Sequence, residues 1–292
     1  MRPRRRWLVL ATALAAGGCG RDVATRAGAS YDDRFGADVM DVHLPVDGAT
    51  ARPAVMFIHG GGWSTGSRDH HTDHATRLAE AGYVTATIDY RLVPAAAYPA
   101  QEQDAQCALA FLRAHATDWG LDPARVAVVG YSAGGHLASL LGVASDEPDF
   151  QPDCAAGPTP PPQAVISGAG PTDVRIWTDI ASVRAMVGGS IDAVPERWDR
   201  LSPITHVRAD APPFLFIHGG ADWIVPVAQS RAMRDALVAV GVDARLLELA
   251  GDGHLTGTGG ASGREDLGVI SIDPPEAWLA LADFLADTVG TP

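Results

Sequence analysis

The chain has 292 residues, of which 47% are hydrophobic, and its formal net charge is −13. This length and this hydrophobic content suit one large domain with a well-buried core. The acidic charge argues against nucleic acid and anionic membrane surfaces as partners, because both repel a negatively charged protein.

The first 18 residues have the pattern of an export signal. Arginines at positions 2, 4, 5 and 6 precede an apolar run from Trp7 to Ala16 that is too short to span a membrane stably. The segment Ala16-Gly-Gly-Cys19 resembles a bacterial lipobox, in which the cysteine is lipidated and begins the mature chain. We expect a signal peptide over 1–18, a lipid anchor on Cys19 as the only membrane contact, and a linker over 19–35. The alternative is ordinary cleavage, with release into the periplasm or the medium; either way, the protein is exported from a bacterial cell.

From residue 36 to residue 292, strand-like and helix-like segments alternate. This alternation predicts one α/β catalytic domain with a mostly parallel central sheet and helices on both faces. Short apolar runs predict strands near 39–44, 54–59, 83–89, 125–130, 163–168, 213–218 and 244–249. Longer segments predict helices near 68–82, 100–117, 132–144, 228–241 and 275–287. The proline-rich stretch between 144 and 212 is irregular, and we expect it to form a small lid or one wall of a pocket.

The segment Gly130-Tyr-Ser-Ala-Gly134 lies between an apolar strand and a helix-like stretch. A serine on such a turn stands clear of the sheet only if its neighbours lack side chains, so this pattern indicates a nucleophile elbow with Ser132 as the nucleophile. The alternative is that Ser132 merely caps the following helix.

An earlier strand ends in His59-Gly-Gly-Gly-Trp63, a segment of the HGGG type that supplies backbone N–H donors to an oxyanion. We expect the donors to be the N–H groups of Gly61 and Gly62, together with that of Ala133, the residue after the nucleophile. The alternative is an ordinary glycine-rich turn with no partner motif elsewhere.

Two later strand ends supply the remaining members of a catalytic triad. Asp222 follows the strand near 213–218, and His254 follows the strand near 244–249. The chain order serine, aspartate, histidine is the order of α/β-hydrolases. Asp252 is a rival for the acid, but it shares the loop of His254, and an orienting carboxylate has to reach the ring from a neighbouring loop. We expect His218 to support the loop of the acid.

Other residues carry weaker expectations. The histidines at positions 70, 71 and 74 lack the pattern of a zinc site, so we expect a solvated helix face and no metal. Cys107 and Cys154 form either one disulfide or two buried free thiols. Trp63 and Trp223 are candidates for substrate binding or for the core. Arg91 and Asp104 are expected to form a structural ion pair.

Several segments resemble the esterase/lipase branch of the α/β-hydrolase superfamily, which includes hormone-sensitive-lipase-like carboxylesterases and feruloyl- and acetyl-ester hydrolases. They are His59-Gly-Gly-Gly-Trp63, Asp89-Tyr-Arg-Leu92, Tyr98-Pro-Ala-Gln-Glu-Gln-Asp104, Gly120-Leu-Asp-Pro-Ala-Arg125 and Gly130-Tyr-Ser-Ala-Gly-Gly-His136. The resemblance implies an α/β-hydrolase fold, the triad Ser132–His254–Asp222, and an oxyanion hole at Gly61, Gly62 and Ala133. With only about 20 residues between the signal and the first strand, no room is left for a large N-terminal cap.

These observations predict a serine carboxylesterase that acts through an acyl-enzyme and needs no metal or organic cofactor. The expected partners are small-molecule esters of short acyl or aryl groups, or ester decorations of polysaccharides. The alternatives are an amide hydrolase of the arylformamidase or peptidase kind and, less favoured, a non-catalytic binding module. The oligomeric state is not predicted.

Overall fold

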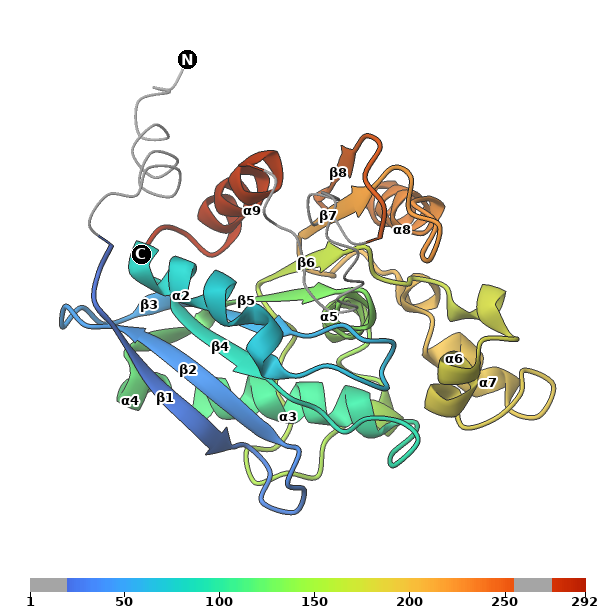
Figure 1. The fold of residues 1–292 in the computed structure, drawn as a ribbon, viewed down its shortest axis with the longest axis horizontal. Coiled ribbons are helices and arrows are strands. Elements are labelled where there is room, and N and C mark those ends of the chain that lie inside the picture. The colour runs from blue at the N-terminus through green and yellow to red at the C-terminus, as the bar shows by residue number, and fades with distance from the viewer. Residues whose placement is uncertain (1–19, 255–274) are drawn as a thin grey trace, which may run out of the picture.

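The computed structural model describes residues 20–254 and 275–292, which form an eight-stranded sheet with helices on both sides (Figure 1). The strand order is β1-β2-β4-β3-β5-β6-β7-β8. β1 and β2 run antiparallel to their neighbours, and β3 to β8 are parallel. The strands are β1 (Val23–Ser30), β2 (Val39–Pro45), β3 (Arg52–Ile58), β4 (Val84–Ile88), β5 (Leu121–Tyr131), β6 (Ala164–Gly168), β7 (Phe214–Gly219) and β8 (Ala244–Leu249). This arrangement confirms the predicted mostly parallel α/β-hydrolase sheet.

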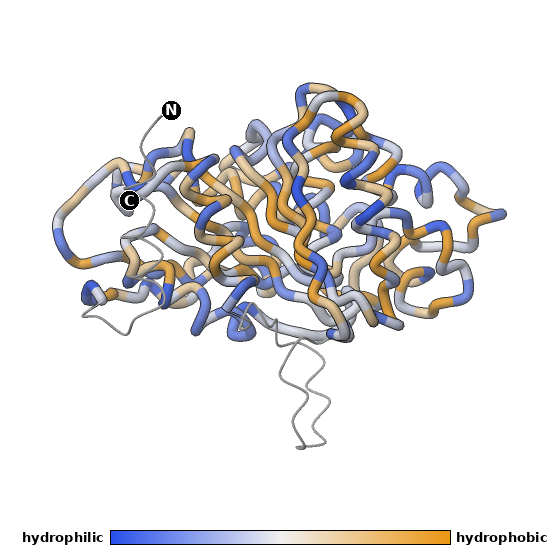
Figure 2. Tube along the Cα trace, turned by 90° about the horizontal axis from the view of Figure 1, so that it is seen from above, coloured by the Kyte–Doolittle hydropathy of each residue, from blue (hydrophilic) through white to orange (hydrophobic). Residues whose placement is uncertain are grey.

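The central strands are apolar throughout because helices cover both faces of the sheet. In β3, Val55 and Phe57 point into one core layer, whereas Met56 and Ile58 point into the other. Figure 2 shows this as hydrophobic traces in the middle of the molecule, with hydrophilic segments mostly towards the periphery.

Helices pack on the sheet in two layers. The helices α2 and α9 cover one face through residues such as Leu78 and Trp278. The helices α3, α5 and α8 cover the other face through residues such as Leu109, Leu137 and Met233. The helices are α2 (Thr72–Ala81), α3 (Ala100–Ala114), α4 (Ala116–Trp119), α5 (Ala133–Val143), α6 (Ala181–Val187), α7 (Pro195–Arg200), α8 (Ala228–Ala239) and α9 (Pro275–Thr288), with short 3-10 turns η1 (Arg68–His71), η2 (Pro148–Phe150), η3 (Val174–Trp177) and η4 (Pro203–His206).

The expected linker over 19–35 is wrong in its middle part, because residues Val23–Ser30 form the edge strand β1. Most of its side chains are exposed, so the strand lacks the apolar alternation by which sequence patterns reveal strands. Backbone pairing with β2 holds it in place. The signal peptide predicted for 1–18 and the lipid site at Cys19 lie outside the described residues. No helix in the described part of the chain is long and apolar enough to cross a membrane.

The stretch between 144 and 212 contains α6 and α7, which the sequence did not predict. Both are anchored to the main body by buried contacts. The Tyr98 N–H donates to the Met186 carbonyl at 2.7 Å, and Trp198 of α7 is fully buried. The stretch is therefore a packed subdomain beside the sheet (Figure 1).

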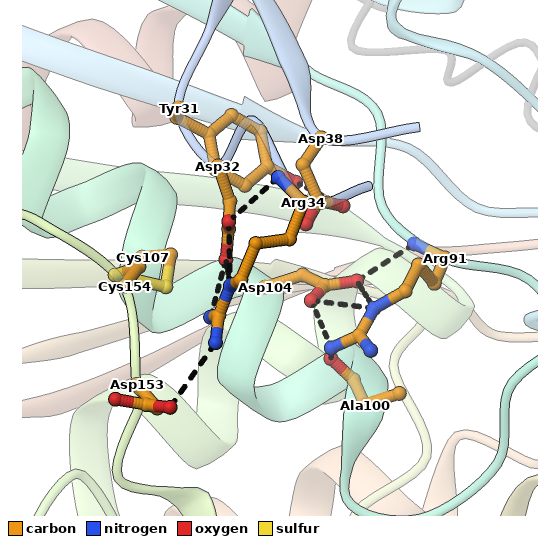
Figure 3. Close-up of a disulfide and its surroundings, with 10 residues drawn as sticks. All are labelled: Tyr31, Asp32, Arg34, Asp38, Arg91, Ala100, Asp104, Cys107, Asp153 and Cys154. Carbon is orange, nitrogen blue, oxygen red and sulfur yellow. Dashed lines mark hydrogen bonds and ion pairs between the residues drawn. A yellow bond between two sulfur atoms is a disulfide. The ribbon is translucent and has the colours of Figure 1, made fainter. Parts of the chain in front are cut away.

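A disulfide and an ion pair link α3 to neighbouring loops (Figure 3). Cys107 of α3 is bonded to Cys154, with a Cα–Cα distance of 6.1 Å. One turn earlier on the helix, Asp104 forms the expected ion pair with Arg91 at 2.5 Å. Of the two alternatives for these cysteines, the structure therefore shows the disulfide and not two free thiols.

Two of the carboxyl groups near α3 are held in the neutral form. Burial raises the pKa of Glu102 to about 8. Burial and the neighbouring Asp104 carboxyl raise the pKa of Asp38 as well. In both cases, desolvation favours the uncharged carboxylic acid over the carboxylate.

We predict that these buried acids make the protein less stable as the pH rises. The folded-state pKa of Glu102, about 8, lies above its ordinary value of 4.5, so its contribution is complete below 4.5 and is lost by about pH 8. The free energy of unfolding should fall over this range, by up to about 1.4 kcal/mol per pH unit for each such acid. Urea unfolding at pH 5 to 8 measures this slope.

Glu102→Gln combined with Asp38→Asn should flatten the slope, because both replacements are neutral at every pH. The exposed Glu196→Gln serves as the matched control and should keep the slope of the unaltered protein. A double variant that retains the full slope would show that these two acids do not cause it.

Candidate active site

Ser132 occupies a sharp turn between β5 and α5. Its φ of 52° and ψ of −121° lie in a region that side-chain-bearing residues rarely adopt. Its side chain makes no capping hydrogen bond to the first turn of α5. The helix-cap alternative is therefore wrong, and the geometry is that of a nucleophile elbow.

The glycines on either side of Ser132 allow this turn to pack closely. A Cβ atom on Gly134 would stand 2.0 Å from the Ile58 carbonyl oxygen, and one on Gly130 would stand 2.0 Å from the Gly134 carbonyl oxygen. Neither position can hold a side chain unless the backbone moves. The turn is thus packed directly against the end of β3.

The glycine segment after β3 lies beside the elbow. A Cβ atom on Gly60 would stand 2.9 Å from the Tyr131 carbonyl oxygen, and Gly61 and Gly62 have φ values of 106° and 58°. Within residues 20–254 and 275–292, the N–H groups of Gly61, Gly62 and Ala133 donate to no protein acceptor. These three donors are therefore available to a bound oxyanion.

The structure brings the three predicted triad residues into one hydrogen-bonded chain. His254 Nε2 is 2.9 Å from Ser132 Oγ, and His254 Nδ1 is 2.7 Å from Asp222 Oδ2. Because a carboxylate accepts, Nδ1 carries the hydrogen, and Nε2 is left to accept from the serine hydroxyl. The rival Asp252 contacts the acid loop through its main chain, where its carbonyl accepts from the Ala221 N–H at 2.9 Å.

Asp222 is held in the charged form. Burial by itself would raise its pKa, but hydrogen bonds from His218 and His254 outweigh burial and lower it. The backbone N–H groups of Ile224 and Val225 also donate to Oδ1, each at 2.9 Å. The carboxylate therefore stays negative next to His254, which stabilises a positive charge on that ring.

The histidines near α2 do not form the expected solvated face. His71 is fully buried and stacks on Phe57 with ring centroids 5.4 Å apart, and His74 lies near Trp278. Burial lowers the pKa of His71, so its neutral ring packs as an aromatic group. Among the described residues, no group of three or more potential ligands could hold a metal ion.

An apolar pocket with a cavity of about 150 Å³ opens at Ser132. The oxyanion loop, the acid loop and the stretch from 171 to 183 provide its walls. Its lining residues are Gly62, Trp63, Ser132, Pro171, Trp177, Ile180, Ser182, Val183, Ile224 and Val225. Most of these residues were missed from the sequence, although the stretch between 144 and 212 is the one for which the sequence predicts a lid or one wall of a pocket.

The two tryptophans differ in their surroundings. Trp63 is only 3% exposed and packs edge-on against His136, with ring centroids 5.2 Å apart. It also lines the pocket, so it belongs both to the core and to the site. Trp223 is 83% exposed and is not among the lining residues. The core alternative is therefore wrong for Trp223.

The fold and this arrangement of serine, histidine and aspartate define an α/β-hydrolase of the esterase/lipase branch. The chain belongs to the BD-FAE family, whose model matches residues 40–237.

Known relatives agree with this assignment. The esterase LipC of Mycobacterium tuberculosis is 36% identical over 75% of this chain and 57% of its own length. The chain spans about half the length of the curated relatives it matches. Among solved structures, esterase 2 of Thermogutta terrifontis is 25% identical, with a TM-score of 0.70 over 91% of this chain and 94% of that one. A carbohydrate esterase from gut microbiota, 23% identical, shares the fold with a TM-score of 0.74 over 94% and 98%.

We predict that Gly134→Ala disrupts the elbow. The added methyl group would collide with the Ile58 carbonyl, so the turn would have to move away from β3, at a cost of about 3 kcal/mol or more in the free energy of unfolding. Denaturant unfolding measures the loss. Gly36→Ala is the matched control, because no heavy atom lies within 4 Å of its added Cβ, and it should stay within about 0.5 kcal/mol. Equal stability of the two variants would contradict the close packing of the elbow.

Proposed function

We propose that the protein is a serine carboxylesterase that hydrolyses esters of short acyl or small aryl groups. The observation that carries this proposal is the hydrogen-bonded chain from Ser132 Oγ through His254 to Asp222, beside three backbone donors that have no protein acceptor within residues 20–254 and 275–292. Relatives named as esterases, LipC among them, support ester chemistry.

The reaction uses each of these groups in turn. His254 Nε2 takes the hydroxyl proton as Ser132 Oγ attacks the ester carbonyl, and Asp222 stabilises the resulting imidazolium. The N–H groups of Gly61, Gly62 and Ala133 bind the oxyanion, and each such donor contributes about 3 kcal/mol to lowering the barrier. The protonated His254 gives its proton to the departing alkoxide. Water, activated by the same ring, then releases the acyl group from Ser132.

The apolar pocket is the binding site for the acyl group. The leaving oxygen has to lie within reach of His254 Nε2, and His254 is not among the residues that line the pocket. The alcohol therefore departs on the histidine side, and the acyl chain enters the pocket between Trp63 and the wall formed by Trp177 and Val183. An apolar cavity of about 150 Å³ holds a molecule the size of benzene, so acyl chains of up to about six carbons fit.

The alcohol part of the substrate lies outside the pocket, so this proposal allows a wide range of leaving groups. The pocket encloses only the acyl part, so the leaving group can be small or can be part of a polysaccharide carrying acyl esters. In its proposed place outside the cell, with a lipid anchor on Cys19, the enzyme would meet such polymers.

We predict that p-nitrophenyl esters from acetate to hexanoate are hydrolysed well, and that kcat/KM falls by about 10-fold or more at octanoate and decanoate, because longer chains overfill the pocket. Ser132→Ala should lower kcat by about 10⁶-fold. Ser139→Ala is the matched control: this buried serine lies on α5, the helix that follows Ser132, its hydroxyl donates to the Gly135 carbonyl at 2.7 Å, and the variant should keep the activity of the unaltered protein.

The corresponding p-nitroanilides separate ester from amide chemistry. Turnover of the anilides but not of the esters would contradict the ester proposal in favour of an amide hydrolase. No turnover of either, together with no adduct from a fluorophosphonate probe, would indicate a binding protein.

A further inference from the structure

A second histidine contacts the acid of the triad from behind. His218, at the end of β7, has a fully buried side chain, as does Asp222. Its Nε2 is 2.8 Å from the Val225 carbonyl oxygen and 3.2 Å from Asp222 Oδ2. Its Nδ1 is 2.7 Å from the hydroxyl oxygen of Ser230 in α8. One imidazole therefore links the acid, a wall of the pocket and a helix.

These contacts fix the tautomer of His218. Both partners of Nε2 are acceptors, so Nε2 carries a hydrogen and donates. Ser230 is fully buried, and within the described residues its hydroxyl contacts His218 Nδ1 and no other hydrogen-bonding atom. The hydroxyl hydrogen is satisfied only if Ser230 donates it to Nδ1, and this requires that Nδ1 carries no hydrogen, so the arrangement fits the neutral ring of His218.

Among the residues that the structure describes, four groups donate to the Asp222 carboxylate, and His218 is one of them. Oδ1 accepts from the backbone N–H groups of Ile224 and Val225, and Oδ2 accepts from His254 Nδ1 and His218 Nε2. A neutral donor holds a carboxylate in place without cancelling its charge, so the charge stays available to His254. The shorter contact, 2.7 Å against 3.2 Å, is the one to His254.

We propose that His218 is a positioning residue for the reaction: as a neutral donor fixed by Ser230, it holds Asp222 Oδ2 against His254 Nδ1. This inference rests on the proposed esterase function. It predicts that His218 acts on the step that His254 catalyses and has little effect on substrate affinity.

The test compares His218→Phe, which keeps the ring shape but donates no hydrogen bond, with His218→Gln, whose amide restores a donor. Steady-state kinetics on p-nitrophenyl acetate are normalised to active sites titrated with paraoxon, so that misfolded protein does not count. His218→Phe should lower kcat by about 10-fold or more with little change in KM, and His218→Gln should recover most of the loss.

The pH profile adds a readout that packing alone would not move. Without the donor from His218, more negative charge remains on Asp222 Oδ2, so the acidic limb of kcat/KM for His218→Phe should shift to higher pH. Ser230→Ala should give a smaller loss of about 3-fold, because the ring keeps its place but not its fixed tautomer. It also serves as the second variant if His218→Phe does not fold. His115→Phe, a histidine at the far end of α3, is the matched control and should match the unaltered protein.

The low-field proton NMR resonance of His254 Nδ1–H does not depend on turnover. It therefore separates the positioning role of His218 from the proposed esterase function. If the unaltered protein hydrolyses no ester but His218→Phe shifts this resonance, the proposed function fails and the positioning role stands. If His218→Phe keeps kcat per titrated site, the acidic limb and the resonance, the positioning role is wrong whatever the substrate. If His218→Phe does not fold and Ser230→Ala does, the same three quantities are measured in Ser230→Ala. The positioning role of His218 is wrong if kcat per titrated site, the acidic limb and the resonance are all unchanged there.

Discussion

The site depends on the close contact between the elbow turn and the end of β3. Gly134 approaches the Ile58 carbonyl so closely that no side chain fits between them. This contact places Ser132 at the carboxyl edge of the sheet in a conformation with positive φ, and it sets the segment from His59 to Trp63 beside the serine. The strain at Ser132 is sustained because the surrounding backbone leaves the turn no alternative position.

A similar close approach joins the other half of the site. A Cβ atom on Gly219 would stand 2.4 Å from the carbonyl oxygens of Asp252 and Gly253, so the end of β7 lies directly against the loop that carries His254. The acid and the histidine come from neighbouring parallel strands, and this contact sets the distance between their loops. Backbone packing therefore places the loops that carry the serine and its two partners, and the side-chain hydrogen bonds of the site add to it.

The sequence revealed the parts of this molecule whose signals are local. The apolar runs of the central strands and the glycines around Ser132 predicted the sheet, the elbow and the order of the triad residues. β1 was missed because its exposed side chains carry no apolar alternation, and α6 and α7 were missed because they are only seven and six residues long. The buried His71 was misjudged because nothing in its neighbours reveals that Phe57 packs against it. The pocket walls and the partners of His218 depend on contacts between distant segments, which sequence patterns do not display.

The central claim is that Ser132 is a nucleophile activated by His254. Mass spectrometry of the protein after brief treatment with paraoxon tests it most directly, with peptide mapping to locate the adduct. The account predicts one diethylphosphoryl group per chain, on Ser132, and much slower labelling in His254→Ala at the same pH. An unlabelled Ser132, or labelling at an unchanged rate without His254, would contradict it.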